Sequence, residues 1–252
     1  MDEFTLTNQA FWDEVAPHHA TSEFYAVERF VAHPDRLAEP ERGELGEVSG
    51  RSLCHLQCHI GLDSLALAYR GAEVTGVDLS EESLKIAREL SARTGIPATF
   101  VQSDVLTAAE TLGSRYDIVF TTRGVLMWVS DLAAWARTCA RLLQPGGVFY
   151  LLDVHPLAMV LEEHDPGFRL TGSYFGGAPN VVEADASYAV RDVGLTHRKT
   201  HEWVHPVGAV VSALAEAGIM IDFLHEHPAD DQVPGALGLP ALYSIRGRLA
   251  GS

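Results

Sequence analysis

The residues best suited to bind a small ligand follow two short apolar runs in the middle of the chain. The first run, SLCHLQC, leads into CHIGLD, where Gly61 precedes a helix-like segment, and the second, EVTGVDL, contains Asp78 seventeen residues after Gly61. Backbone amides at a helix N-terminus favour a polar or anionic ligand group. A carboxylate at the end of the next strand can accept both hydroxyls of a ribose. A single glycine and a single acid are weak evidence when taken alone.

Further polar residues follow the next apolar runs. Asp104 comes after ATFVQS and can accept from an adenine amino group, and Thr121, Thr122 and Arg123 end the run YDIVFTT. His155 follows GVFYLLDV, where its imidazole can take a proton near neutral pH with Arg123 opposite it. An equally weighted alternative is that His155 only shapes the pocket, because a reaction at an atom that is already nucleophilic needs mainly alignment of the reacting atoms and exclusion of water.

The first loop also has the composition of a metal site, with Cys54, His55, Cys58 and His59 close together. Alternation along a strand sends Cys54 and His55 to opposite faces, whereas zinc needs four converging ligands. We therefore predict no metal, and interpret the cysteines as core residues.

The elements that must position these residues alternate from residue 51 onward. Short apolar runs and amphipathic segments take turns, which predicts a doubly wound α/β domain with a mostly parallel sheet and helices on both faces. Ligands of such sheets bind beyond the carboxyl ends of the strands. No helix separates the last two runs, IMIDFLHEH and ALYSIRGRLA, so the final strand is expected to be antiparallel.

The pattern divides the chain into four parts. Residues 1–50 are predicted to form a helical flap and linker, 51–155 the Rossmann-like core, 156–203 an inserted lid, and 204–252 the completion of the sheet. The lid prediction rests on the glycines and aromatic residues that interrupt the pattern after His155.

Net charge and composition limit the classes of binding partner. The 252 residues carry 18 Lys and Arg against 34 Asp and Glu, a net charge of −16, with 47% hydrophobic residues. This charge disfavours nucleic acid, and the apolar fraction supports a full core. Three cysteines and no signal-like or membrane-spanning run predict a cytoplasmic location. The expected partner is a small molecule, and the expected state is a monomer or homodimer.

The segment from Leu53 to His155 resembles the class I S-adenosylmethionine-dependent methyltransferases. GVDLSEESLKIARE, QSDVL, YDIVFTT and LLQPGGVFYLLDVH occur in the family's order and spacing. The resemblance implies a seven-stranded sheet with an antiparallel final strand, S-adenosylmethionine as methyl donor and S-adenosylhomocysteine as product. The first loop departs from the family's L-D-L-G-C-G-x-G pattern, because LCHLQCHIG has His55, Gln57 and His59 in place of the acid and two glycines. It is similar to a bacterial small-molecule subgroup with HLQCHxGLD.

Carried over by position, the resemblance implies a set of cofactor-binding residues. These are Gln57, Cys58, His59 and Gly61 on the methionine-binding loop, Asp63 for the cofactor ammonium, Asp78 for the ribose, Leu79, Ser103 and Asp104 for the adenine, and Thr121 beside the methionine end. Substrate-binding candidates come from the flap and the insertion: Trp12, His19, Tyr25, Tyr174, Phe175 and Trp203. Helix or core packing is the competing interpretation for each aromatic residue.

The predicted reaction is in-line transfer of a methyl group to a nitrogen or oxygen of a small aromatic or heterocyclic metabolite, with His155 and Arg123 as catalytic candidates. Three alternatives stay open. The first is a cyclase or lyase that acts on S-adenosylmethionine itself, and the second is an inactive cofactor-binding subunit. The third is a dinucleotide-dependent oxidoreductase, although CHIGLD lacks the G-x-G-x-x-G pattern of that class.

Overall fold

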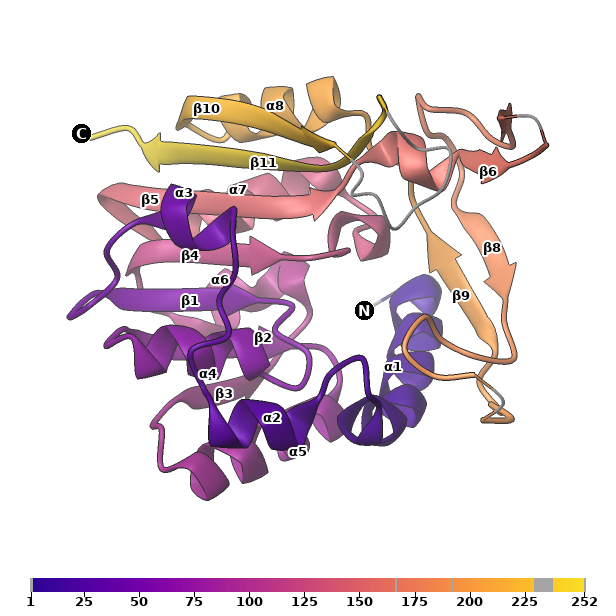
Figure 1. Cartoon of the computed structure of the whole chain (residues 1–252). Helices are drawn as coiled ribbons and strands as arrows, with labels where there is room; N and C mark the ends of the chain where they lie inside the picture. The colour runs from indigo at the N-terminus through magenta and orange to yellow at the C-terminus, as the bar shows by residue number, and fades with distance from the viewer. Residues whose placement is uncertain (1, 166, 192, 229–237, 252) are drawn as a thin grey trace.

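A computed structural model describes residues 2–165, 167–191, 193–228 and 238–251. Its centre is a seven-stranded sheet with the order β10-β11-β5-β4-β1-β2-β3 (Figure 1). The strands are β1 (Ser52–Leu56), β2 (Glu73–Asp78), β3 (Thr99–Gln102), β4 (Tyr116–Thr122), β5 (Leu143–Val154), β10 (Ile219–Pro228) and β11 (Pro240–Leu249). All neighbours are parallel except that β11 is antiparallel to both β5 and β10. The predicted fold class and final antiparallel strand are confirmed.

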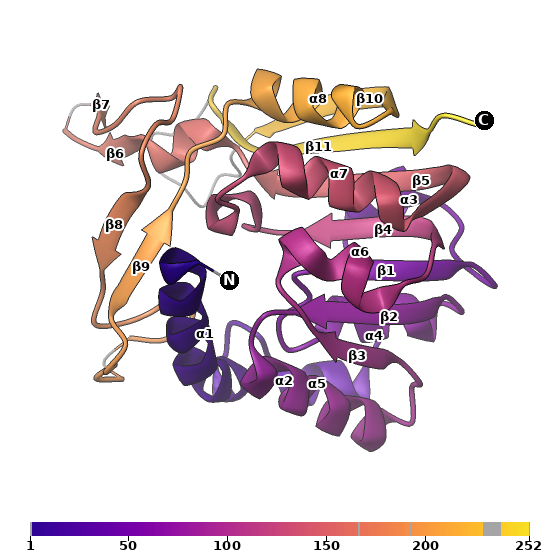
Figure 2. The same cartoon turned by 180° about the vertical axis from the view of Figure 1, so that it is seen from behind.

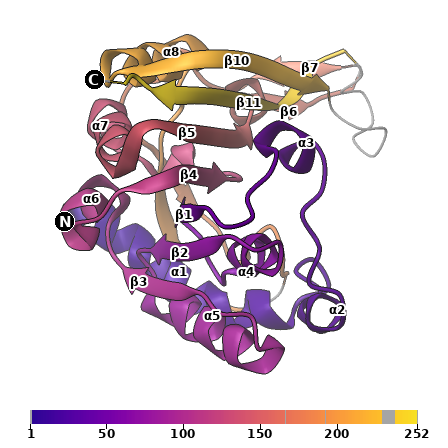
Figure 3. The same cartoon turned by 90° about the vertical axis from the view of Figure 1, so that its left-hand side faces the viewer.

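Helices cover both faces of this sheet, as Figure 3 shows. The helices are α1 (Glu3–Thr21), α2 (Val27–Ala32), α3 (Glu41–Leu45), α4 (Leu62–Tyr69), α5 (Glu81–Thr94), α6 (Ala108–Leu112), α7 (Leu132–Leu142) and α8 (Val207–Glu216), with short 3-10 turns η1 (Val105–Thr107), η2 (Leu126–Trp128) and η3 (Pro156–Met159). Side chains of β4 divide between two cores. Val119 packs with α6, α7 and α8, whereas Ile118 and Phe120 pack on the other side with α3 and α4. This alternation is the reason that the strands are apolar throughout.

Local signals fix the helices that flank the site. Ser80 caps α5 by accepting from the Ser83 amide, and Gly95 ends it in the left-handed region. Helix α3 forms within the segment 1–50 predicted as a helical flap and linker, and helix α1 runs through Pro17. The Pro-Gly-Gly segment before GVFYLL belongs to β5.

The region predicted as an inserted lid contains two small antiparallel hairpins. They pair β6 (Leu161–Glu163) with β7 (Phe168–Leu170), and β8 (Asn180–Glu183) with β9 (Lys199–Glu202). Strand β9 lies beside α1 at the carboxyl edge of the sheet, which Figures 1 and 2 show from opposite sides. Residues 229–237, between β10 and the final strand, lie outside the described residues. In the described part of the chain, no helix combines the length and apolarity needed to cross a bilayer.

Gly61 provides a test of how tightly the first loop is packed. Its φ is +76°, and an added Cβ would lie 2.8 Å from the Cβ of Ala87 and 2.9 Å from Phe100. Gly95 has a φ of +70° but open space around it. We expect Gly61→Ala to lower the free energy of unfolding by about 3 kcal/mol, because crowding adds to backbone strain. Gly95→Ala should cost about 1 kcal/mol. Urea denaturation measures both, and equal losses would contradict this packing.

Candidate functional site

Three predicted cofactor-binding residues meet at the carboxyl edge of the central strands. Leu56 at the end of β1 is in register with both Val77 of β2 and Thr121 of β4, so Gln57, Asp78 and Thr121 lie at the same edge of three neighbouring strands, with β1 in the middle. The buried atoms Gln57 Oε1, Thr121 Oγ1 and Thr122 Oγ1 have no hydrogen-bond partner among the described residues. A buried polar atom without a partner costs about 1–3 kcal/mol. A polar ligand that supplied hydrogen-bond partners to these oxygens would fit the carboxyl edge of the strands.

The Asp78 carboxylate has the geometry of a hydroxyl acceptor. Its Oδ2 accepts from the His59 amide at 2.7 Å, and its Oδ1 accepts from the Ser80 amide at 2.9 Å. Each oxygen keeps a second lone pair. Burial raises the pKa of Asp78 to about 6, and the backbone hydrogen bonds oppose that rise. At neutral pH the carboxylate is therefore ionised and can accept two ribose hydroxyls.

The bulky first loop keeps a glycine-like backbone. Gln57 and His59, which stand where the family pattern has glycine, adopt φ values of +57° and +49°. Few residues other than glycine occupy this left-handed region. Both positions therefore have a backbone conformation that favours glycine while they carry larger side chains. This conformation is compatible with glycine at the same places in the family pattern, and the sequence alone did not show it.

The added His59 side chain is part of a chain of hydrogen bonds. Its Nδ1 lies 3.0 Å from Ser83 Oγ, its Nε2 lies 2.9 Å from His19 Nδ1, and His19 Nε2 lies 2.7 Å from Ser187 Oγ. Burial is the main cause that lowers the pKa of His59 to about 3 and that of His19 to about 4. Both imidazoles are therefore neutral at pH 7. They join the first loop to α1 and to the predicted lid.

The three flap aromatics gather on this loop. Ring centroids lie 5.2 Å from His59 for Trp12, 5.1 Å for His19 and 5.3 Å for Tyr25. Helix α1 is also anchored to the neighbouring loop after β2. Gln9 donates to the Leu79 carbonyl at 3.2 Å, and other contacts join α1 to the α5 N-terminus. The flap therefore covers the predicted cofactor site.

The other predicted cofactor residues have local partners. Asp63 pairs with Arg36 at 3.3 Å, and Asp104 caps η1 by accepting from the Leu106 amide at 2.9 Å. Ser103 Oγ lies 3.0 Å from Thr111 Oγ1. Cys58 is buried, and Gly61 precedes α4 in a crowded position. Contact between these residues and a cofactor stays a prediction.

The histidines and cysteines of the first loop do not converge on one point but have separate surroundings. His55 Nδ1 lies 2.8 Å from Ser64 Oγ, and Cys54, Cys58 and Cys139 are buried and unbridged. In the ranges that the structure describes, no three His, Cys, Asp or Glu side chains are grouped as metal ligands.

The two catalytic candidates are both paired with other groups. His155 is 3% exposed, its Nδ1 accepts from the Leu157 amide at 3.2 Å, and its Nε2 lies 3.0 Å from Glu226. Arg123 donates to Glu41 at 2.6 Å. These contacts occupy both nitrogens of His155. The arrangement gives His155 a structural role at the start of η3 and leaves it without a free basic nitrogen.

The insertion candidates occupy different places. Trp203 is buried, and its amide donates to the Met127 carbonyl at 2.8 Å. The Tyr174 hydroxyl accepts from the Val207 amide at 3.3 Å, whereas Phe175 is 84% exposed. Of these three, Trp203 lines a pocket beside the predicted cofactor site.

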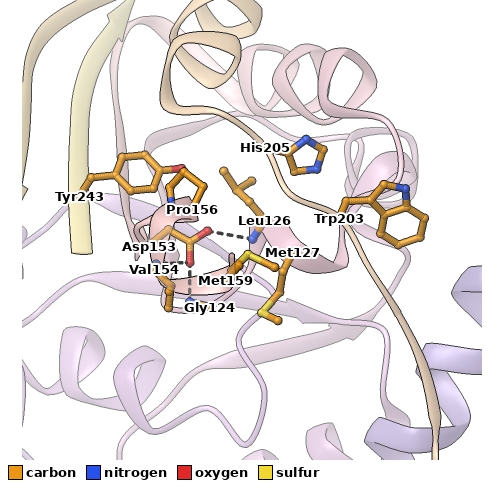
Figure 4. A pocket seen from close by; sticks show the side chains of 10 residues that line it. All are labelled: Gly124, Leu126, Met127, Asp153, Val154, Pro156, Met159, Trp203, His205 and Tyr243. Atoms are coloured by element: carbon orange, nitrogen blue, oxygen red, sulfur yellow. Dashed lines mark hydrogen bonds between the residues drawn. The ribbon is translucent and has the colours of Figure 1, made fainter. Parts of the chain in front are cut away.

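That pocket lies where the loop after β4, the end of β5 and the end of the insertion meet (Figure 4). Its lining consists of Gly124, Leu126, Met127, Asp153, Val154, Pro156, Met159, Trp203, His205 and Tyr243. The same loop contacts the first loop, because the Gln57 Nε2 donates to the Val125 carbonyl at 2.9 Å. The pocket and the predicted cofactor site therefore share one loop.

Asp153 holds this shared loop and was not predicted as a site residue. Its carboxylate accepts from the amides of Gly124 and Leu126, as Figure 4 shows, and from those of Val125 and Val154. Burial raises its pKa, and the four amides oppose the rise. The signal available in the sequence was an acid near the end of the apolar run GVFYLLDV, the same pattern that identified Asp78.

Comparison with known proteins finds similarity to methyltransferases. Residues 54–147 match the family model described as a methyltransferase domain. A ubiquinone biosynthesis O-methyltransferase of Proteus mirabilis is 35% identical over 151 residues, which cover 60% of this chain and 58% of that protein. One of the same name from a Methylobacterium species is 26% identical over 228 residues, covering 87% and 90%.

A solved structure shares the fold. An S-adenosylmethionine-dependent methyltransferase from Mesorhizobium loti has a TM-score of 0.66 at 24% identity, covering 85% of this chain and 99% of its own. The matched methyltransferase domain covers residues 54–147, and the seven-stranded fold is shared with this solved structure. The alignment with the Proteus relative spans little more than half of that protein's length.

Proposed function

We propose that this protein transfers the methyl group of S-adenosylmethionine to an oxygen or nitrogen of a small molecule. One observation carries the proposal: a domain similar to methyltransferases brings Asp78 to the same strand edge as the buried oxygens of Gln57 and Thr121, which have no hydrogen-bond partner among the described residues. The names of the O-methyltransferase relatives favour oxygen as the accepting atom.

Each residue at this edge would bind a different part of the cofactor. Asp78 would accept the ribose hydroxyls, and Gln57 and Thr121 would bind polar groups at the methionine end. The bound cofactor would supply a methyl group on a positively charged sulfur. The chain's own contribution is alignment of the reacting atoms and exclusion of water.

Water exclusion is the role we assign to α1 and the insertion. Asn8 of α1 donates to the His201 carbonyl at 2.8 Å and accepts from the His201 amide at 2.8 Å, both in buried positions. Glu14 accepts from the amides of Thr196 and His197. These contacts fasten the flap to the insertion, so that both cover the edge as one unit.

Calorimetric titration of the purified protein tests the cofactor. We expect heat of binding with S-adenosylmethionine and none with NAD. Mass spectrometry after incubation with a metabolite extract should show S-adenosylhomocysteine formed only when extract is present. Methylthioadenosine formed without extract would indicate a lyase instead. Binding of NAD but not of S-adenosylmethionine would favour the oxidoreductase alternative.

The raised pKa of Asp78 predicts a pH dependence of cofactor affinity. The ionised carboxylate accepts ribose hydroxyls, so protonation below a pKa of about 6 weakens binding. Between about pH 7.5 and about pH 5 we expect the dissociation constant to rise about tenfold. His59 and His19 stay neutral across this range, since their pKa values are about 3 and about 4. Calorimetry over this range measures the effect, and Asp78→Asn should remove it. A constant affinity in the unmodified protein would contradict the assignment.

A further inference from the structure

His59 joins the first loop to two segments that lie far from it in the sequence. Its Nε2 lies 2.9 Å from Nδ1 of His19 in α1, and His19 Nε2 lies 2.7 Å from Ser187 Oγ of the insertion. On the other side of the ring, His59 Nδ1 lies 3.0 Å from Ser83 Oγ in the first turn of α5. One chain of hydrogen bonds therefore runs from the first loop through the flap to the insertion.

The two imidazoles can bond to each other because both are neutral. Burial lowers the pKa of each ring, so at pH 7 each has one nitrogen that donates and one that accepts. The serine hydroxyls at the two ends of the chain can donate or accept. Every imidazole nitrogen therefore has a partner, whichever of the two histidines donates to the other.

Aromatic rings surround the contact between the two histidines. Tyr25 is stacked on His19 with ring centroids 5.2 Å apart, and Trp12 lies 5.2 Å from His59. Tyr188 of the insertion lies 5.1 Å from His19, and its hydroxyl bonds to that of Tyr25. The side chain of His19 thus contacts the first loop and the insertion at the same time.

Helix α1 bridges the two loops that flank the predicted ribose position. The His59 amide donates to Asp78 Oδ2 at 2.7 Å, and Gln9 of α1 donates to the carbonyl of Leu79, the residue after Asp78, at 3.2 Å. Figures 1 and 2 show α1 between the carboxyl edge of the sheet and β9. A cofactor held by Asp78 would lie between these loops, on the side that α1 covers.

We propose that the His19–His59 hydrogen bond is a latch that keeps α1 and the insertion closed over the cofactor, and that opening of this latch sets the rate of cofactor exchange. The inference rests on the proposed methyltransferase function. His59 is a positioning residue: its backbone has a φ of +49°, which glycine would also adopt, but its side chain supplies a link to the flap that glycine lacks. Opening of such lids limits the turnover of many enzymes.

Replacing His59 with glycine tests the latch without straining the loop. Glycine adopts positive φ freely, so His59→Gly should keep the turn and the amide that donates to Asp78. Stopped-flow mixing with S-adenosylhomocysteine, followed by tryptophan fluorescence because Trp12 packs on His59, measures exchange. We expect the association and dissociation rate constants both to rise about tenfold, with the dissociation constant changed less than about threefold. Unchanged rates, or a rise in the dissociation rate constant alone, would overturn the proposal.

Two variants of α1 show whether the histidines act as one pair. His19→Phe keeps a ring against Tyr25 but cannot bond to His59, and it should raise both rate constants about as much as His59→Gly does. The double variant should exchange no faster than the faster single variant, because each change breaks the same bond. His18→Phe is the matched control, since His18 lies outside this chain of hydrogen bonds, and its rates should stay unchanged. Additive effects of the two latch variants, or an equal effect of the control, would refute the latch.

Hydrogen exchange of the protein without cofactor separates the latch from the proposed function. In His59→Gly the amides of α1 should exchange about tenfold faster than in the unmodified protein, whereas those of β4 and β5 should keep their rates. Unchanged exchange in α1 would refute the latch whether or not the cofactor binds. Failure of the unmodified protein to bind S-adenosylmethionine is a different result, and it would refute the proposed function.

Discussion

Replacing Asp153 with alanine is expected to lower the free energy of unfolding by about 4 kcal/mol. The change removes the acceptor of four amides. Three of them belong to the loop after β4, which lines the pocket and also contacts Gln57. Each buried donor left without a partner costs about 1–3 kcal/mol, part of which water entering the vacated space recovers. Urea denaturation gives the loss, and Asp153→Asn, which keeps one acceptor oxygen, should lose about half as much.

An exposed helix N-cap residue, Asp131, provides the matched control for Asp153→Ala. Asp131 accepts from one amide, that of Ala134 at the exposed start of α7. Asp131→Ala should cost about 1 kcal/mol, the ordinary value for a lost helix cap. If Asp153→Ala were no more destabilising than this variant, the carboxylate could not be the group that holds the loop.

The second large effect concerns Asp78 and the cofactor. Asp78→Asn keeps the shape of the side chain but removes its charge and one acceptor oxygen, at the position proposed to bind the ribose. Hydrogen bonds to charged groups contribute about 1.5–3 kcal/mol each, so we expect affinity for S-adenosylmethionine to fall about 100-fold. Calorimetry measures the affinity, and the melting temperature shows whether the variant is folded.

Asp117 offers a control in the same sheet. It lies at the start of β4, where its carboxylate accepts from the Ser52 amide at 2.9 Å and the Ser52 hydroxyl at 2.7 Å. That position is at the opposite edge from Asp78. Asp117→Asn should leave cofactor affinity unchanged. A similar loss of affinity in both variants would mean that a general effect on stability, and not a contact with the ribose, explains the result.

The sheet and its carboxyl edge could be predicted because they depend on local patterns. Alternating strands and helices determine the direction of each strand, and the residue after each strand then lies at a known edge. Asp78 and Thr121 were located in this way. The ends of α5 can also be predicted from the sequence, because Ser80 and Gly95 are residue types typical of a helix N-cap and C-cap.

The pocket could not be predicted because its walls come from distant segments. His155 follows its strand as expected, but contact with Glu226 from the far strand β10 engages its imidazole. His205 lies two residues after the insertion, and its Nε2 donates to the carbonyl of Val129. Neither partner is local in sequence, so no spacing rule identifies it. The left-handed backbone of Gln57 and His59 is also hidden, because those residue types rarely adopt it.

The most direct test of the account follows the methyl group itself. The protein would be incubated with a metabolite extract and S-adenosylmethionine that carries a deuterated methyl group, and the products separated by mass spectrometry. We predict that S-adenosylhomocysteine and a deuteriomethylated small molecule form in equal amounts, and that Asp78→Asn, at a cofactor concentration below saturation, forms far less of both. Consumption of S-adenosylmethionine with no deuterium in any acceptor, or no consumption at all, would contradict the proposed methyl transfer.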